Sequence, residues 1–272
     1  MPFYQNINPT LIEIGPFSVR YYGLVYVIGF LVATYILIKL AKANKIKKLN
    51  EDKVGDLMLY LLMGGVLGAR LVHILLEINY YFKNPLEIFM IWHGGMAFIG
   101  GLAGGILASY FFCRKNKINF YEIADFIVLP FAFFLGLGRI ANFINAEFVG
   151  RIANVPWCVY FQNYIGCRHP SQIYEALKNF AIFGILLFFY LRKDKNKNKL
   201  KDGFVFWLFI ALYGLLRFIT NFFREDPLYF HLSIGQWMSL VMFFTGAFVL
   251  IRNYLNKDKL EIKKQLKHRR KK

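Results

Sequence analysis

The stretch from Gly136 to Arg151, GLGRIANFINAEFVGR, follows an apolar run over residues 127–135, IVLPFAFFL. Polar side chains next to so apolar a helix are costly unless they meet one another or a polar ligand. Two interpretations are open: a helix end whose charges are hydrated among lipid headgroups, or a binding site for an anionic headgroup. Arginine favours the second, because its planar, permanently charged fork matches two phosphate oxygens at a time. The polar side chains of this stretch are Arg139, Asn142, Asn145, Glu147 and Arg151.

The composition is that of a polytopic membrane protein. Of the 272 residues, 57% are hydrophobic and 19% aromatic, and several apolar runs approach the roughly 20 residues that a helix needs to cross a bilayer. A net charge of +18 would suit a nucleic-acid-binding protein, but the basic residues lie between apolar runs, so we expect no nucleic acid partner. We expect an all-α helical bundle, because only helices and closed barrels satisfy backbone groups in lipid.

Seven segments are predicted to cross the membrane, at about residues 21–40, 54–76, 96–113, 123–140, 173–191, 204–223 and 234–251. Residues 1–252 are expected to form one transmembrane domain, with an exterior loop region at 142–171, and residues 253–272 a basic cytoplasmic tail. No basic segment or cleavage site precedes the first span, so we expect it to stay as an anchor. Two glycine-rich stretches, residues 64–69 and 100–105, are typical of helix faces that approach a neighbour closely.

The basic residues predict the orientation of the spans. Four clusters, at residues 39–53, 114–117, 192–201 and 252–272, follow the first, third, fifth and seventh spans. Because cytoplasmic loops carry the excess of Lys and Arg, one threading puts all four clusters in the cytoplasm. The N-terminus and the loop at 142–171 are then outside, and the C-terminus is inside.

Further polar residues lie in the outer halves of the predicted spans. Two pairs, three or four positions apart and therefore on one helix face, are Arg70 with His73 and Tyr213 with Arg217. Together with Arg139, this gives three arginines near the outer half of the membrane. Ion pairs with Asp125 or Glu147 are the structural alternative to a ligand site.

Missing motifs exclude several enzyme classes. The sequence has no GxSxG elbow, no Walker A loop and no HExxH motif, which argues against an esterase, an ATPase and a metalloprotease. No metal and no cofactor is expected. Alkyl transfer to a thiol stays open, because it needs a deprotonated thiol and cations around a phosphate leaving group rather than a carbonyl oxyanion hole. A disulfide between Cys158 and Cys167, nine residues apart in the polar loop, also stays open.

The run from Gly138 to Gly150, GRIANFINAEFVG, closely resembles the diagnostic motif of the prolipoprotein diacylglyceryl transferases. These bacterial membrane enzymes transfer diacylglycerol from phosphatidylglycerol to a cysteine of lipoprotein precursors. The resemblance extends over about residues 21–240. Its other landmarks, in family order, are YYGL at 21–24, GAR at 68–70, HGGMAF at 93–98, DF at 125–126, RHPSQ at 168–172, YGLLR at 213–217 and SIGQ at 233–236.

The resemblance implies a transferase of the bacterial inner membrane. Its substrates would be phosphatidylglycerol and prolipoprotein signal peptides with a lipobox cysteine, and it would release glycerol phosphate in the first step of lipoprotein maturation. The residues implied in catalysis are Arg139, Arg217, Glu147, Asn142 and Tyr22. The residues implied in phosphatidylglycerol binding are Arg139, Arg217, Arg70, Asn145, Gly150 and Tyr213.

The chain departs from the family pattern at Ile99, where many members have a histidine implicated in catalysis, and at Asn221, where an acid is common. His93 and His73 are the substitute candidates for a base, and a thiol activated by the arginines alone is the alternative. The alternative function is a transporter or flippase that binds a phospholipid headgroup. A transporter predicts paired broken helices, whereas Pro130 is the only proline inside a predicted span.

Overall fold

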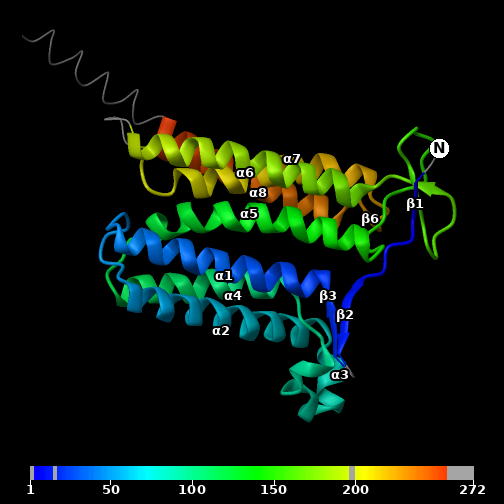
Figure 1. The fold of residues 1–272 in the computed structure, drawn as a ribbon, viewed down its shortest axis with the longest axis horizontal. Helices are drawn as coiled ribbons and strands as arrows, with labels where there is room; N and C mark the ends of the chain where they lie inside the picture. Colours follow the sequence, from blue (N-terminus) through cyan, green and yellow to red (C-terminus); the bar gives the residue numbers. More distant parts are fainter. Residues whose placement is uncertain (1–2, 15–16, 196–199, 256–272) are drawn as a thin grey trace, which may run out of the picture. The chain divides into compact units, whose positions relative to one another are not determined.

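The computed structural model describes residues 3–14, 17–195 and 200–255 (Figure 1). The chain divides into two compact units, one of residues 1–31 and 124–272 and the other of residues 32–123. Both are mostly helical, as the apolar composition predicts. Most of the predicted basic tail, residues 256–272, lies outside the described residues.

The unit of residues 32–123 is organised by two helices that lie side by side, α2 and α4 (Figure 1). A methyl group added at Gly68 would collide with the carbonyl of Gly100, and one added at Gly64 would collide with that of Gly104. The predicted close approach of the small-residue faces is therefore confirmed. The elements here are the second half of α1 (Tyr21–Lys42), α2 (Glu51–Leu76), α3 (Ile78–Lys83), the 3-10 turns η1 (Pro85–Ile88) and η2 (Ile91–His93), and α4 (Phe98–Lys115).

The other unit contains most of α5 (Phe120–Ile144), with α6 (Ser171–Lys195), α7 (Phe204–Thr220), η3 (Asn221–Phe223), α8 (Ile234–Leu250) and the π-helical turn η4 (Ile251–Leu255). Figure 1 shows α6, α7 and α8 running alongside one another. Small residues again permit the contact, because a methyl group added at Gly214 of α7 would lie 2.6 Å from the backbone nitrogen of Phe243. Helix α8 begins with a capping box, in which Ser233 and Gln236 bind each other's backbone N–H at 3.1 and 2.9 Å.

Six helices in the described part of the chain are long and apolar enough to cross a membrane: Tyr21–Lys42, Glu51–Leu76, Phe120–Ile144, Ser171–Arg192, Phe204–Phe223 and Ile234–Tyr254. They correspond to six of the seven predicted spans. The third predicted span, now α4, falls short of that standard. It is 18 residues long, contains several glycines and ends in Arg114 and Lys115, so its only 18-residue window includes two charged residues.

Asp125 of α5 sets the register between α5 and α7. Its carboxylate is fully buried and accepts the backbone N–H groups of Gly203 and Phe206, both at 2.8 Å. N–H groups in the first turn of a helix have no partner within the helix, so this carboxylate caps α7 from a neighbouring element. Arg139 follows Asp125 on α5 by fourteen residues, and Arg217 follows Gly203 by the same number. At 1.5 Å per residue, each arginine is therefore about 21 Å along its helix from the Asp125–Gly203 hydrogen bond.

The polar segments contain short strands, which the all-α prediction lacked. The pairs are β1 (Phe3–Gln5) parallel with β4 (Val159–Phe161), β4 antiparallel with β5 (Cys167–Arg168), β2 (Thr10–Ile14) with β3 (Phe17–Arg20), and β6 (Leu228–Tyr229) with β7 (Leu232–Ser233). Gln5 Nε2 donates to the carbonyl of Ile144 at 2.7 Å and so ties β1 to the end of α5. The fold is therefore a helical membrane protein with a small sheet region.

Candidate functional site

The segment after α5 is held in place by the start of α6. Gln172 Nε2 donates to the carbonyl of Glu147 at 2.7 Å, and the Ser171 hydroxyl donates to that of Phe148 at 2.9 Å. Ala146 and Phe148 both have φ of 53°, a conformation that costs a non-glycine residue energy and persists where the surroundings impose it. The contacts with α6 therefore hold the segment from Ala146 to Phe148 in this conformation.

Glu147 receives the amides of the predicted site. Asn142 Nδ2 donates to one carboxylate oxygen at 3.0 Å, and Asn145 Nδ2 donates to the other at 3.3 Å. In this structure these amides orient Glu147, so the three side chains form one hydrogen-bonded group.

Gly150 is the point where three segments meet. A methyl group added there would lie 2.7 Å from the carbonyl oxygen of Phe223 and would collide with the carbonyl of His169. Gly150 N donates to the His169 carbonyl at 3.2 Å, and Arg168 Nη1 donates to the Gly150 carbonyl at 3.0 Å. Only glycine fits here, which gives a packing reason for a residue that the resemblance implicates in substrate binding.

Glu175 on α6 joins the two predicted phosphate-handling arginines. Arg139 Nε lies 2.9 Å from Glu175 Oε2, and Arg217 Nη1 lies 3.1 and 3.0 Å from the two carboxylate oxygens. The acid that pairs with them is thus neither Asp125 nor Glu147, the partners considered from the sequence. The Glu175 side chain is 2% exposed, whereas Arg139 and Arg217 are 18% and 20% exposed. The carboxylate therefore lies behind the guanidinium groups, which retain access to a ligand.

Two further cations approach the same carboxylate. Arg224 Nη1 lies 3.7 Å from Glu175 Oε1, and Lys178 Nζ lies 3.8 Å from Oε2. Arg224 also pairs with Asp226 at 3.0 Å. We call Arg139, Lys178, Arg217 and Arg224, with Glu175 and Asp226, the Glu175 cluster; its four cations outnumber its two carboxylates. An excess of positive charge at this degree of burial favours an anionic ligand.

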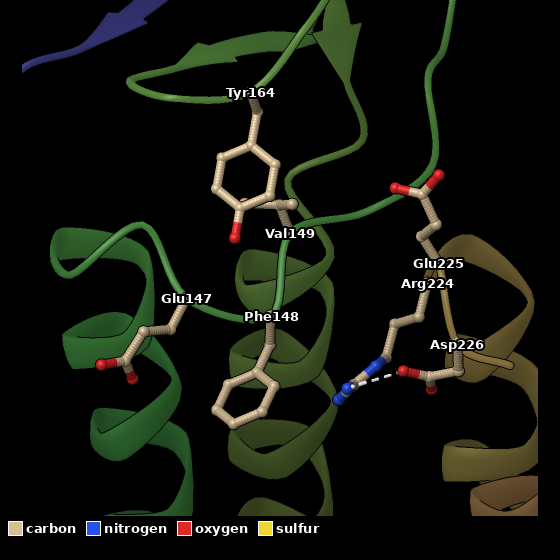
Figure 2. A pocket seen from close by; sticks show the side chains of 7 residues that line it. All are labelled: Glu147, Phe148, Val149, Tyr164, Arg224, Glu225 and Asp226. Atoms are coloured by element: carbon tan, nitrogen blue, oxygen red, sulfur yellow. Dashed lines mark hydrogen bonds and ion pairs between the residues drawn. The ribbon is translucent and has the colours of Figure 1, made fainter.

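A cavity of about 390 Å³ adjoins the Glu175 cluster (Figure 2). Its lining residues are Glu147, Phe148, Val149, Tyr164, Arg224, Glu225 and Asp226. The Phe148 ring lies 5.2 Å from the guanidinium carbon of Arg224 and 5.9 Å from that of Arg139, distances at which a ring face attracts a cation. Figure 2 shows Glu147 on one side of this ring and Arg224 on the other. Phe148 therefore connects the cavity with the cluster.

Two of the predicted tyrosines lie in the same unit. Tyr22 and Tyr26 bring their hydroxyls to 3.1 Å, and Tyr26 is within electrostatic reach of Arg139 and Tyr213. Tyr213 lies one helical turn before Arg217 on α7 and within electrostatic reach of it. The predicted residues Tyr22 and Tyr213 thus lie in the same unit as the two arginines and near them.

Arg70, His73 and His93 lie together in the unit of residues 32–123. The buried Arg70 guanidinium donates to the carbonyls of Ile88, Gly94 and Gly95 at 3.1, 2.6 and 3.0 Å, and also to that of Glu87. His73 fills the space next to Gly95, and His93 Nδ1 lies 3.0 Å from the Glu87 carboxylate. Ile99 is 54% exposed.

His169 lies in a hydrogen-bonded chain at the entry to α6. Trp157 Nε1 donates to the Tyr174 hydroxyl at 2.7 Å, and that hydroxyl lies 3.1 Å from His169 Nδ1. Burial lowers the pKa of His169 from its ordinary value, because it disfavours the charged imidazolium. A neutral ring that accepts the Tyr174 proton at Nδ1 is consistent with both observations.

The loop that contains these residues is cross-linked. Cys158 and Cys167 form a disulfide with a Cα–Cα distance of 5.5 Å, which settles the question that their spacing left open. The bond joins the residue before β4 to the first residue of β5. Arg168, next to it, reaches both Gly150 and the Glu225 carboxylate.

Comparison with known proteins identifies the family. The family model for prolipoprotein diacylglyceryl transferase matches residues 9–252. A phosphatidylglycerol–prolipoprotein diacylglyceryl transferase from Geobacter sulfurreducens is 40% identical over 250 residues, covering 89% of this chain and 94% of the relative. One from Pasteurella multocida is 40% identical over 266 residues, covering 94% of this chain and 96% of the relative. The chain belongs to the prolipoprotein diacylglyceryl transferase family.

Proposed function

We propose that the Glu175 cluster is the place where this chain carries out the activity of its family, the transfer of a diacylglyceryl group from phosphatidylglycerol to a prolipoprotein. The observation that carries this proposal is the convergence of Arg139 and Arg217, from two helices, on one buried carboxylate. Glu175 fixes the position of both guanidinium groups, and their remaining donors can face a lipid phosphate.

The reaction suits such a site. The cysteine sulfur of the prolipoprotein attacks the glycerol carbon that carries the phosphate, so a carbon–sulfur bond forms and the carbon–oxygen bond breaks. The electron pair goes to the phosphate oxygen of the leaving glycerol phosphate, and the thiol proton goes to that phosphate or, if a histidine serves as base, to its imidazole. Arg139 and Arg217 stabilise the charge that develops on the phosphate, a type of stabilisation that contributes a large share of catalysis in other enzymes. The same cations lower the pKa of a nearby thiol from its usual value of about 8.5.

The other predicted residues support this arrangement in different ways. We assign Glu147, with Asn142 and Asn145, to the hydroxyl groups of the lipid headgroup, since Glu147 lines the cavity next to the cluster. Tyr22 and Tyr213 would position the arginines. We assign Arg70 to the architecture of the Glu87–Gly95 segment, because its guanidinium donates to the carbonyls of that segment rather than facing a ligand.

His73 and His93 are the proposed alternatives for a base. The Glu87 carboxylate next to His93 would orient that imidazole. We expect His73→Gln and His93→Gln each to reduce transfer less than Arg139→Ala, because the arginines alone activate the thiol. Loss of turnover in His93→Gln, with loss of an ionisation near neutral pH from the pH–rate profile, would make His93 the base instead.

We propose that the protein lies in the bacterial inner membrane with the loop at 142–171 and the N-terminus outside and the C-terminus in the cytoplasm. This needs α4 to cross next to α2. Glycine contacts at both Gly64 and Gly68 run along that pair, so α4 follows a helix long enough to span the bilayer. The Cys158–Cys167 disulfide supports an exterior loop, because disulfides persist in oxidising compartments.

Topology reporters test this orientation. Fusions after Lys48 and Lys117 should report a cytoplasmic position, and one at Asn163 should report an exterior position. Fusions after Lys199 and at the C-terminus, both predicted to be cytoplasmic, lie outside the described residues. A cytoplasmic signal at Asn163 would overturn the orientation.

The activity itself is tested with purified protein. A peptide with a lipobox cysteine is incubated with phosphatidylglycerol vesicles, and mass spectrometry should show a peptide bearing one diacylglyceryl group. The peptide with the cysteine replaced by serine is the matched control and should stay unmodified. An unmodified cysteine peptide, with folded protein throughout, would contradict the proposal.

A further inference from the structure

Lys178 occupies a costly position. Its side chain is 3% exposed, and within the described structure its Nζ has no hydrogen-bond partner. Nζ lies 4.3 Å from the centre of the Tyr213 ring and 3.8 Å from Glu175 Oε2, which is ion-pair distance but too long for a hydrogen bond. A buried ammonium without an acceptor destabilises a protein.

Neutralising Glu175 does not require Lys178 in this structure. Two arginines already bind the carboxylate at 2.9 to 3.1 Å, and Arg224 approaches it from 3.7 Å. Residues that destabilise the resting structure without local compensation are often those that function needs. The position of Lys178 therefore points to a state in which Glu175 has lost its arginine partners.

The layering of the cluster indicates what that state is. Arg139 and Arg217 are about one-fifth exposed, whereas Glu175 and Lys178 are buried. An arriving phosphate would meet the two arginines first and draw their guanidinium groups away from the carboxylate. Arg224 would still lie 3.7 Å from Oε1, but Oε2, the oxygen that both arginines contact, would have only Lys178 nearby, and a buried charged oxygen without a partner is strongly unfavourable.

We propose that Lys178 is a positioning residue that takes over Glu175 when Arg139 and Arg217 turn to the lipid phosphate. Lys178 and Glu175 are three residues apart on α6, so the helix keeps them on one face. A small movement of the flexible lysine side chain would shorten the 3.8 Å separation to a hydrogen-bonded ion pair. The proposal rests on the function proposed above, because it needs the phosphate to bind at the arginines.

The test compares five purified proteins in the transfer assay with phosphatidylglycerol vesicles: wild type, Lys178→Met, Lys178→Arg, Glu175→Gln and the double variant Glu175→Gln/Lys178→Met. Lys178→Met should raise KM for phosphatidylglycerol about tenfold and change kcat less than about threefold, because lipid binding then leaves Oε2 of Glu175 without a partner. Its Tm should equal or exceed that of the wild type, since the resting protein loses an unsatisfied ammonium. Lys178→Arg keeps the charge and should stay within about threefold of the wild-type KM.

The double variant distinguishes this role from a purely structural one. Without the Glu175 carboxylate, lipid binding leaves no charge unpaired, so the KM of the double variant should lie within about threefold of that of Glu175→Gln alone. An unchanged KM in Lys178→Met, a lower Tm in that variant or additive effects in the double variant would each overturn the proposal. If Lys178→Met does not accumulate, the same KM and Tm measurements are made on Lys178→Gln. Lys201→Met removes an exposed lysine and is the control, with KM and Tm expected to match the wild type. No transfer by the wild type would instead overturn the proposed function, and this inference with it.

Discussion

Nη1 of Arg217 lies within 3.1 Å of both carboxylate oxygens of Glu175. Only one guanidinium nitrogen contacts Glu175, so the other N–H groups of Arg217 can donate to a phosphate. Replacing either Arg217 or Arg139 with Ala should lower kcat/KM about a hundredfold or more, as removal of an electrostatic donor does elsewhere. The Lys variants keep the charge but lose the fork, so their activity should lie between those of the Ala variants and the wild type.

The measurement is transfer to the lipobox peptide at matched amounts of protein in the membrane. Arg114→Ala, at the exposed end of α4, is the control and should retain full activity. Full activity in both alanine variants at the site would remove the arginines from the mechanism.

Gly150→Ala should destabilise the protein because the added methyl group has no room between the carbonyls of His169 and Phe223. Overpacking of this kind costs about 1–3 kcal/mol. Gly184→Ala is the matched control, since nothing lies within 4 Å of a methyl group at that helical position. Thermal unfolding in detergent should show a lower Tm for Gly150→Ala alone. Equal Tm values would mean that the three segments move apart without cost.

Asp125→Ala removes the carboxylate that caps α7. The buried N–H group of Gly203 and the partly buried one of Phe206 then lose their acceptor. Hydrogen bonds to charged groups contribute about 1.5–3 kcal/mol each, so we expect a loss of at least about 2 kcal/mol in unfolding free energy. Exposed Asp52→Ala should change it by less than about 0.5 kcal/mol. A loss no larger for Asp125→Ala than for Asp52→Ala would show that the cap is dispensable.

His169 should make stability depend on pH. Burial lowers its pKa in the folded protein, so the unfolded chain binds the proton more tightly. Its stabilising contribution is therefore present above its ordinary pKa of about 6.5 and is lost as the pH falls below that value. Unfolding measured between pH 5 and 7.5 should depend less on pH in His169→Gln, whereas exposed His231→Gln should retain the wild-type profile. Identical profiles for wild type and His169→Gln would contradict this assignment.

The helices could largely be predicted from the sequence, because apolar runs of span length form helices in lipid for a reason that is local. The predicted segment at residues 204–223, for example, has the same bounds as the corresponding candidate span. The strands could not be predicted in this way. β1 pairs with β4 more than 150 residues later, and each strand is too short to show an alternating pattern.

The candidate site was predicted in part. Arg139 and Arg217 could be identified from their charge inside apolar helices and from the family motif. Glu175 and Lys178 carried a weaker signal: two opposite charges, three apart, near the start of an apolar helix. Which arginines would reach them depends on the packing of α5, α6 and α7, and no local pattern encodes that packing.

Arg139 and Glu175 are also separated in time during synthesis. Helix α5 leaves the ribosome before α6, so Arg139 has no access to Glu175 until α6 has been made. An arginine alone in a membrane helix is unfavourable. We therefore expect α5 to remain at the translocon until α6 arrives, so that the two helices enter the bilayer as a hairpin. Crosslinking of nascent chains truncated before and after α6 should show α5 leaving the translocon only in the longer chain.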